Sequence, residues 1–109
     1  MNICILTIQY PSPNRMGGFA AMTKQLAIAL HQKGHEITIL VPKRNGEASY
    51  EDDEGITVKR IGFNQLSKKK TYTEIDADVY HSQNQNAMTY FAQKHQPQKK
   101  HIVTCRDPR

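Results

Sequence analysis

The chain has 109 residues, the length of one ordinary domain, which excludes a complete two-domain enzyme. Its hydrophobic fraction of 38%, with no Trp, suffices for a modest core because the apolar residues are gathered in short runs. No run approaches the roughly 20 apolar residues of a membrane span, and the first residues lack the features of a secretion signal, so we expect a cytoplasmic protein.

The formal charge of +5 at pH 7 comes from basic residues spread along the chain. The lysine runs at 68–70 and 99–100 are not interleaved with aromatic residues that could stack on bases, so we expect no nucleic-acid partner. Solvated loops are the favoured interpretation of these runs, and peripheral contact with an anionic membrane at its inner face is the alternative. Cys4 and Cys105 lie in apolar segments without metal-ligand spacing, so we expect buried thiols and no metal.

The first half of the sequence has the pattern of a βαβ unit. Residues 3–8 are almost continuously apolar, which is typical of a central strand covered on both faces. Residues 9–18 contain two prolines, two glycines and an asparagine and predict a long loop. From residue 19 to 33 apolar residues recur at helical spacing, with Gly34 as the C-terminal cap, and residues 36–41 predict a second buried strand.

The second half predicts three more strands and another helix. Polar residues 43–55 predict a surface loop, and the more alternating residues 56–61 predict a strand at or near a sheet edge. Residues 64–74 are polar and leave room for a short helix. The remaining predicted elements are a strand at 78–81, a loop at 82–86, a helix at 87–95 and a strand at 101–105.

Together these elements predict an α/β fold, an open, mostly parallel Rossmann-like sheet with helices on both faces. We expect the first strand to be central and the strands, numbered along the chain, to follow the order 3-2-1-4-5. In such sheets ligands bind beyond the carboxyl ends of the strands. Three segments should meet there, namely the loop at 9–18, the loop at 81–86 and the tail at 106–109.

Gly17 and Gly18 open the first helix and are candidates for binding a phosphate or a sugar hydroxyl. A helix N-terminus presents unpaired N–H groups, and the missing Cβ lets a ligand approach the backbone closely. The alternative is that the two glycines only provide the turn into the helix. Fingerprints for dinucleotides, for the phosphates of mononucleotides and for a serine nucleophile are absent from the sequence.

The order and spacing of these motifs resemble the opening of the family-four retaining glycosyltransferases, which have the GT-B fold. The resemblance covers essentially the whole chain. It begins with a strand that leads through a Pro-rich loop to Gly-Gly. The other landmarks are Leu-Ala-x-Ala-Leu at 26–30, Gly-His-Glu-Ile-Thr-Ile at 34–39, Asp-Ala-Asp-Val-Tyr-His at 76–81 and Ile-Val-Thr at 102–104.

The resemblance implies that residues 1–109 are one half of a GT-B architecture. They would form a single N-terminal, acceptor-side domain, a truncated fragment of a two-domain enzyme. The partner would be a C-terminal donor-binding domain that holds a nucleotide-sugar substrate, and the acceptor would be a carbohydrate or a lipid-linked molecule. The family needs no cofactor and no metal. The fragment alone is expected to be inactive.

The resemblance also assigns site residues. Gly17 and Gly18 would reach toward the donor diphosphate. Many family members place a histidine after the last strand, where this chain has Arg106, which is one catalytic candidate. The other is His81, which follows a short predicted strand and could bond to a sugar hydroxyl; the alternative is a histidine satisfied within its own loop. The candidates for substrate contacts, all in loops expected at the cleft, are Tyr10, Arg15, Gln83 and Asn84.

Two other interpretations stay open from the sequence. In one, the chain is a stand-alone α/β domain that binds a nucleotide or an anion without catalysis. In the other, it is a basic domain that docks on an anionic membrane or a polyanion. Strong nucleotide-sugar binding by this chain alone would favour the first of these, and strongly salt-dependent binding to vesicles or DNA would favour the second.

Overall fold

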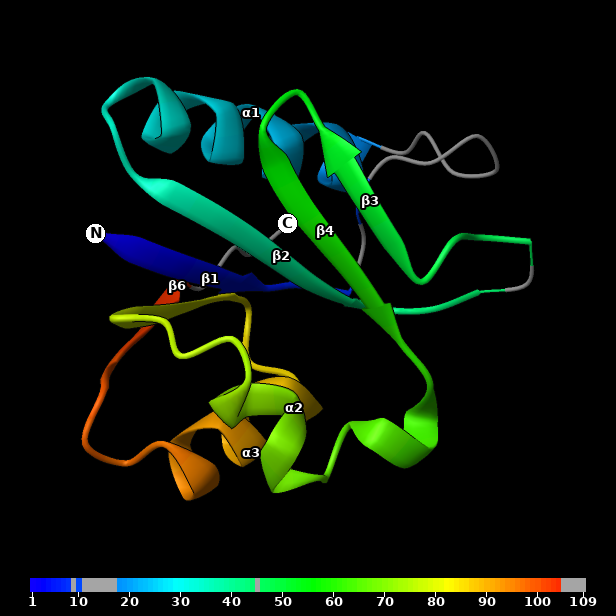
Figure 1. Cartoon of the computed structure of the whole chain (residues 1–109), viewed down its shortest axis with the longest axis vertical. Coiled ribbons are helices and arrows are strands. Elements are labelled where there is room, and N and C mark those ends of the chain that lie inside the picture. Colours follow the sequence, from blue (N-terminus) through cyan, green and yellow to red (C-terminus); the bar gives the residue numbers. More distant parts are fainter. Residues whose placement is uncertain (9, 11–17, 45, 105–109) are drawn as a thin grey trace.

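The computed structural model describes residues 1–8, 10, 18–44 and 46–104. Its elements in chain order are β1 (Asn2–Leu6), α1 (Gly18–Gln32), β2 (Glu36–Pro42), β3 (Tyr50–Asp53), β4 (Ile56–Ile61), η1 (Phe63–Gln65), α2 (Lys69–Thr73), β5 (Val79–Gln83), α3 (Ala87–His95) and β6 (Lys100–Thr104). The strands form one sheet in the order β3-β4-β2-β1-β5-β6 (Figure 1). The predicted α/β fold and the predicted order of the parallel strands are confirmed, and β3 is added at one edge.

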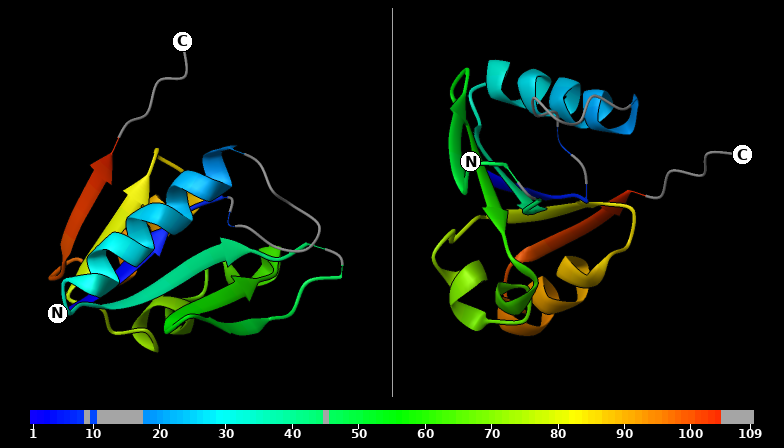
Figure 2. Two further views of the ribbon diagram at one scale, coloured as in Figure 1. Left: turned by 90° about the horizontal axis from the view of Figure 1, so that it is seen from above. Right: turned by 90° about the vertical axis from the view of Figure 1, so that its right-hand side faces the viewer.

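Helices cover both faces of the sheet. α1 lies on one face, and α2 and α3 lie on the other (Figure 2). In β1, Ile3 and Ile5 pack in the cluster under α1, while Cys4 and Leu6 pack in the cluster on the opposite face. All four side chains are at most 8% exposed, because successive residues of a strand point to opposite faces. This two-sided burial explains the continuous apolar run in the sequence.

The end of α1 follows the predicted glycine cap. Gly34 has a φ of +95°, the left-handed conformation that glycine adopts without a steric penalty. Its N–H donates to the His31 carbonyl at 3.0 Å, and the His35 N–H donates to the Leu30 carbonyl at 3.3 Å. These two bonds form a Schellman motif, which satisfies the last carbonyls of the helix and sends the chain directly into β2.

The predicted surface loop at 43–55 is wrong in part, because Tyr50–Asp53 forms β3, antiparallel to β4. The two strands are joined at Glu54 and Gly55, whose φ angles are 55° and 89°. Positive φ at both central residues is typical of the two-residue hairpin turns whose twist matches that of the strands. Asp and Glu have low β propensity, so the acidic composition does not predict a strand here. Pairing with β4 stabilises β3 nevertheless.

The strand predicted at 78–81 continues to Gln83 in β5, so residues 82 and 83 do not belong to the following loop as predicted. Ser82 and Gln83 are polar, yet each is only 2% exposed. Their side chains are satisfied inside the protein: the Ser82 Oγ accepts a hydrogen bond from the Thr89 Oγ1 of α3 at 2.8 Å. Buried polar side chains need such partners, and the sequence pattern alone does not reveal them.

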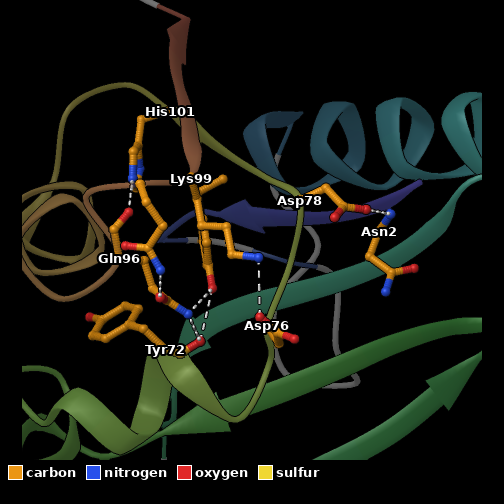
Figure 3. A network of polar contacts seen from close by, with 9 residues as sticks. Asn2, Tyr72, Asp76, Asp78, Gln96, Lys99 and His101 are labelled. Atoms are coloured by element: carbon orange, nitrogen blue, oxygen red, sulfur yellow. Dashed lines mark hydrogen bonds and ion pairs between the residues drawn. The ribbon is translucent and has the colours of Figure 1, made fainter.

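A network of polar contacts fastens α2 and α3 to β5 and β6 (Figure 3). The Tyr80 hydroxyl donates to the Tyr72 carbonyl at 2.8 Å, and the Gln96 Nε2 lies 3.4 Å from that hydroxyl. The Nε2 of His101 lies 2.7 Å from the Gln96 carbonyl, and the His101 ring stacks on Tyr80 at 5.4 Å between centroids. The helical layer on this face is therefore held to the sheet by directed bonds as well as by apolar packing.

Candidate functional site

The carboxyl ends of β1 and β5 meet where the strand order reverses. β1 leads to α1 on one face of the sheet, and β5 leads to α3 on the other (Figure 2). Connections that leave to opposite faces open a crevice between the two strand ends, and ligands of open α/β sheets bind there. We call this region the carboxyl edge, comprising the ends of β1, β2, β4, β5 and β6 and the residues that follow them.

Among the described residues, the α-helices α1 and α3 begin at the carboxyl edge, because each runs back along the strand before it. α1 begins at Gly18 and α3 at Ala87, and neither has an acidic residue in its first turn. The Asn86 side chain caps α3 by accepting hydrogen bonds from the backbone N–H groups of Met88 at 2.9 Å and Thr89 at 3.3 Å. The positive ends of both helix dipoles therefore favour a negatively charged ligand at this edge.

Gln83 joins the end of β5 to α1. Its Oε1 accepts a hydrogen bond of 2.5 Å from the Oγ1 of Thr23, and both residues are at most 2% exposed. This bond links the last residue of β5 to the first half of α1. Gln83 thus holds the start of α1 beside the strand end, and its expected contact with substrate stays a prediction.

His81 lies two residues before Gln83 on the same strand and is half-buried. Its Nε2 is 2.5 Å from the Thr104 Oγ1 at the end of β6. Burial lowers the pKa of His81 from its ordinary value of 6.5, so the imidazole is neutral at pH 7. A neutral imidazole carries one donor and one acceptor nitrogen, which suits it to a hydroxyl rather than to a phosphate.

The lowered pKa of His81 has a consequence for stability. In the unfolded chain the His81 imidazole binds a proton near pH 6.5, whereas in the folded protein it binds one only at lower pH. The free energy of unfolding therefore falls as the pH drops through 6.5. We expect the free energy of unfolding of the His81→Asn variant to fall less over the same interval. Urea denaturation at a series of pH values compares the two proteins, and parallel profiles would contradict the burial of a neutral imidazole.

Asn84 turns the chain out of β5 toward α3. Its φ of +61° lies in the left-handed region, which Asn tolerates better than most residues. The Asn84 N–H donates to the Thr104 carbonyl at 2.7 Å, and its own carbonyl accepts from the Asn86 Nδ2 at 3.2 Å. The turn therefore places Asn84 at the carboxyl edge, where the sequence predicted it, and its contact with substrate stays a prediction.

Tyr10 fastens the chain beyond β1 to β3 and α1. Its hydroxyl donates to the Asp53 Oδ2 at 2.8 Å, and the same oxygen is 3.2 Å from the Lys24 Nζ. Tyr10 is 2% exposed, and burial, followed by the bond to Asp53, raises the pKa of its phenol. Tyr10 is therefore a core residue, and the acceptor contact predicted for it would require the hydroxyl to leave Asp53.

A cavity of about 360 Å³ adjoins the ends of β1, β2 and β4. It is lined by Ile8, Pro42, Lys43, Arg44 and Phe63, and the Phe63 side chain is 82% exposed. Lys43 and Arg44 belong to the predicted surface loop at 43–55, and the sequence predicts no role for them. Two basic residues that directly follow a parallel strand indicate positive charge at the carboxyl edge, so the sequence does contain a signal for them.

Three of the predicted site residues, Arg15, Gly17 and Arg106, lie outside the described residues. Of the glycine pair, the structure describes Gly18 as the first residue of α1. Within the described ranges, no group of His, Cys, Asp or Glu side chains could hold a metal ion. In the same part of the chain no helix is both long and apolar enough to cross a membrane.

The sheet order and the helices on both faces define a Rossmann-like α/β domain, whose candidate ligand site is the carboxyl edge. Residues 2–104 match the family model described as the starch synthase catalytic domain. The chain therefore belongs to this family of glycosyltransferases. The match supports a glycosyltransferase fragment and does not single out family four, which the motifs resemble. No curated protein matched the chain.

Proposed function

We propose that this chain is the acceptor-side domain of a retaining glycosyltransferase. The enzyme would transfer a hexose from a nucleotide-sugar to a carbohydrate or lipid-linked acceptor. The single observation that carries the proposal is the family match over residues 2–104. The carboxyl edge supports it, since two helices without acidic residues in their first turns begin where a diphosphate would have to be bound.

The residues of the edge have distinct proposed tasks. The backbone N–H groups of Gly17 and Gly18 would stabilise the departing diphosphate. Neutral His81 would bind a sugar hydroxyl, and Asn84 and Arg15 would orient the acceptor. Arg106 would add positive charge near the leaving group. In this proposal the enzyme works by positioning and charge stabilisation, and no side chain is required as a general base.

The proposal extends to the partners of the domain. A C-terminal donor-binding domain would hold most of the nucleotide-sugar, so the chain alone would not turn over. The family-four resemblance, the cytoplasmic location, the lack of a cofactor and a peripheral contact with anionic membrane are parts of the same proposal. The lysines at 68–70, of which two lie in α2, would be the basic residues available for that contact.

A titration of this chain with nucleotide-sugars tests whether most of the donor-binding surface lies outside the chain. We expect weak binding, because only one wall of the site is present, and any shifted backbone amides should belong to the start of α1. Calorimetry with uridine, adenosine and guanosine diphosphate sugars measures the affinity, and amide NMR spectra locate the shifts. Tight binding of any of them by the chain alone would favour a stand-alone nucleotide-binding domain instead.

A further inference from the structure

The β3–β4 hairpin, η1 and α2 enclose a hollow of about 300 Å³ on the face of the sheet that carries α2 and α3. We call it the hairpin hollow. It shares no lining residue with the cavity at the carboxyl edge. Its size is at the lower end of the range for small-ligand sites. The lining residues are Leu40, Ser49, Tyr50, Lys59, Arg60, Ile61, Gln65, Thr71 and Glu74.

One wall of the hairpin hollow is an exposed aromatic ring. Tyr50 is 63% exposed and stands directly opposite Lys59 in the β3–β4 register, so both side chains lie on the same face of the sheet. Leu40 and Ile61, both buried, supply apolar surface beside it. An exposed ring next to an apolar surface suits a flat ligand whose faces are hydrocarbon and whose rim is polar.

The polar groups of the hollow include both donors and acceptors. The Thr71 Oγ1 donates to the Gln65 carbonyl at 2.7 Å, which leaves its lone pairs for a ligand hydroxyl. The Gln65 Oε1 accepts from the Gly62 N–H at 3.3 Å, which fixes the amide so that its nitrogen remains a donor. Each hydroxyl of a sugar both donates and accepts, so alternating donors and acceptors match a pair of neighbouring hydroxyls.

Of the charged residues that line the hollow, Lys59 and Glu74 offset each other, and Arg60 pairs with Glu51. The Lys59 Nζ is 4.0 Å from the Glu74 Oε2, and the Glu74 Oε1 is 3.6 Å from the Lys70 Nζ. Ion pairs this exposed contribute little to stability, so a ligand can rearrange them at small cost. Arg60 adds no free charge, because its side chain is 2% exposed and paired with Glu51. The hollow therefore gives no preference to an anion, in contrast to the carboxyl edge.

We propose that the hairpin hollow binds a neutral oligosaccharide. One sugar ring lies against Tyr50, and its hydroxyls bond to Gln65, Thr71 and Glu74. A polymeric acceptor held here has a raised effective concentration at the carboxyl edge. That role rests on the proposed function, whereas the binding itself does not require transferase activity.

The test is an NMR titration of the 109-residue chain with maltoheptaose and with cellohexaose, both neutral oligosaccharides. We expect millimolar binding of at least one, with shifts in the backbone amides of 49–61 and 65–74. Tyr50→Ala should weaken that binding about tenfold, and Glu74→Gln should weaken it several-fold. The matched control is Tyr90→Ala, because Tyr90 is 60% exposed on α3 and does not line the hollow.

Three results would overturn the inference. They are the absence of shifts at the lining residues with either sugar, shifts confined to the carboxyl edge, and equal binding by the Tyr50→Ala variant. Because Tyr50 is exposed, we expect the variant to keep the wild-type spectrum outside the hollow. Binding at the hollow without sugar transfer by the complete protein would refute the proposed function and leave this inference standing.

Discussion

Replacing Arg60 by Met is expected to lower the free energy of unfolding by about 3 kcal/mol. The guanidinium is 2% exposed, and its Nη1 donates to the Ala48 carbonyl at 3.2 Å. Its Nη2 lies 2.9 Å from the Glu51 Oε1 and forms an ion pair with it. The Glu47 carboxylate, 4% exposed, lies 3.9 Å from the Nε. Methionine keeps the apolar stem but removes the positive charge from two carboxylates.

Urea denaturation measures this loss, and Lys59→Met is the matched control. Lys59 is the neighbouring residue on β4, and its ion pair with Glu74 is 4.0 Å long and partly exposed. The control should cost less than about 1 kcal/mol. Equal effects of the two substitutions would mean that the buried cation does not hold β3 against β4.

Gln83→Leu is expected to lower sugar transfer by the complete protein about 100-fold. Leucine has a similar volume but cannot accept the hydrogen bond from Thr23, so the start of α1 is no longer fixed to the end of β5. If the helix start binds the diphosphate, its displacement reduces the rate of transfer at saturating acceptor. The acceptor KM should change much less, since Gln83 is buried and acts through α1.

Initial rates at varied acceptor and donor concentrations separate these effects. Gln32→Leu is the control, because Gln32 is exposed at the opposite end of α1 and does not belong to the carboxyl edge. It should transfer sugar at the wild-type rate. A Gln83→Leu enzyme with unchanged turnover would show that the position of α1 does not matter to the reaction.

The central strands could be predicted because a strand that is buried on both faces has an almost continuous run of apolar residues. Residues 3–8 are apolar except for Thr7, and residues 36–41 are apolar except for Glu36 and Thr38, which is typical of central strands in a covered sheet. β3 could not be predicted, because Tyr50–Asp53 is acidic and is stabilised by a long-range partner, Arg60. The end of β5 was missed for the same kind of reason, since the partners of Ser82 and Gln83 lie on α3 and α1.

The candidate site could be predicted as an edge, but the tasks of its side chains could not. Asn84 lies at the edge because the topology puts every parallel strand end there, and the side chain of His81, in the middle of β5, contacts Thr104 at the end of β6. Tyr10 is instead buried against Asp53, and nothing in the loop sequence indicates a partner 43 residues away. Lys43 and Arg44 were missed because the pattern assigned a loop to them, although they directly follow a parallel strand.

The most direct test of the account is sugar transfer itself. The complete protein is incubated with labelled nucleotide-sugars and with carbohydrate and lipid-linked acceptors, and the product's anomeric configuration is determined by NMR. A retaining enzyme should give a glycoside with the configuration of the donor, and the Gln83→Leu variant should form it far more slowly. A product of inverted configuration, or nucleotide-sugar binding without transfer to any acceptor, would contradict the assignment as a retaining glycosyltransferase.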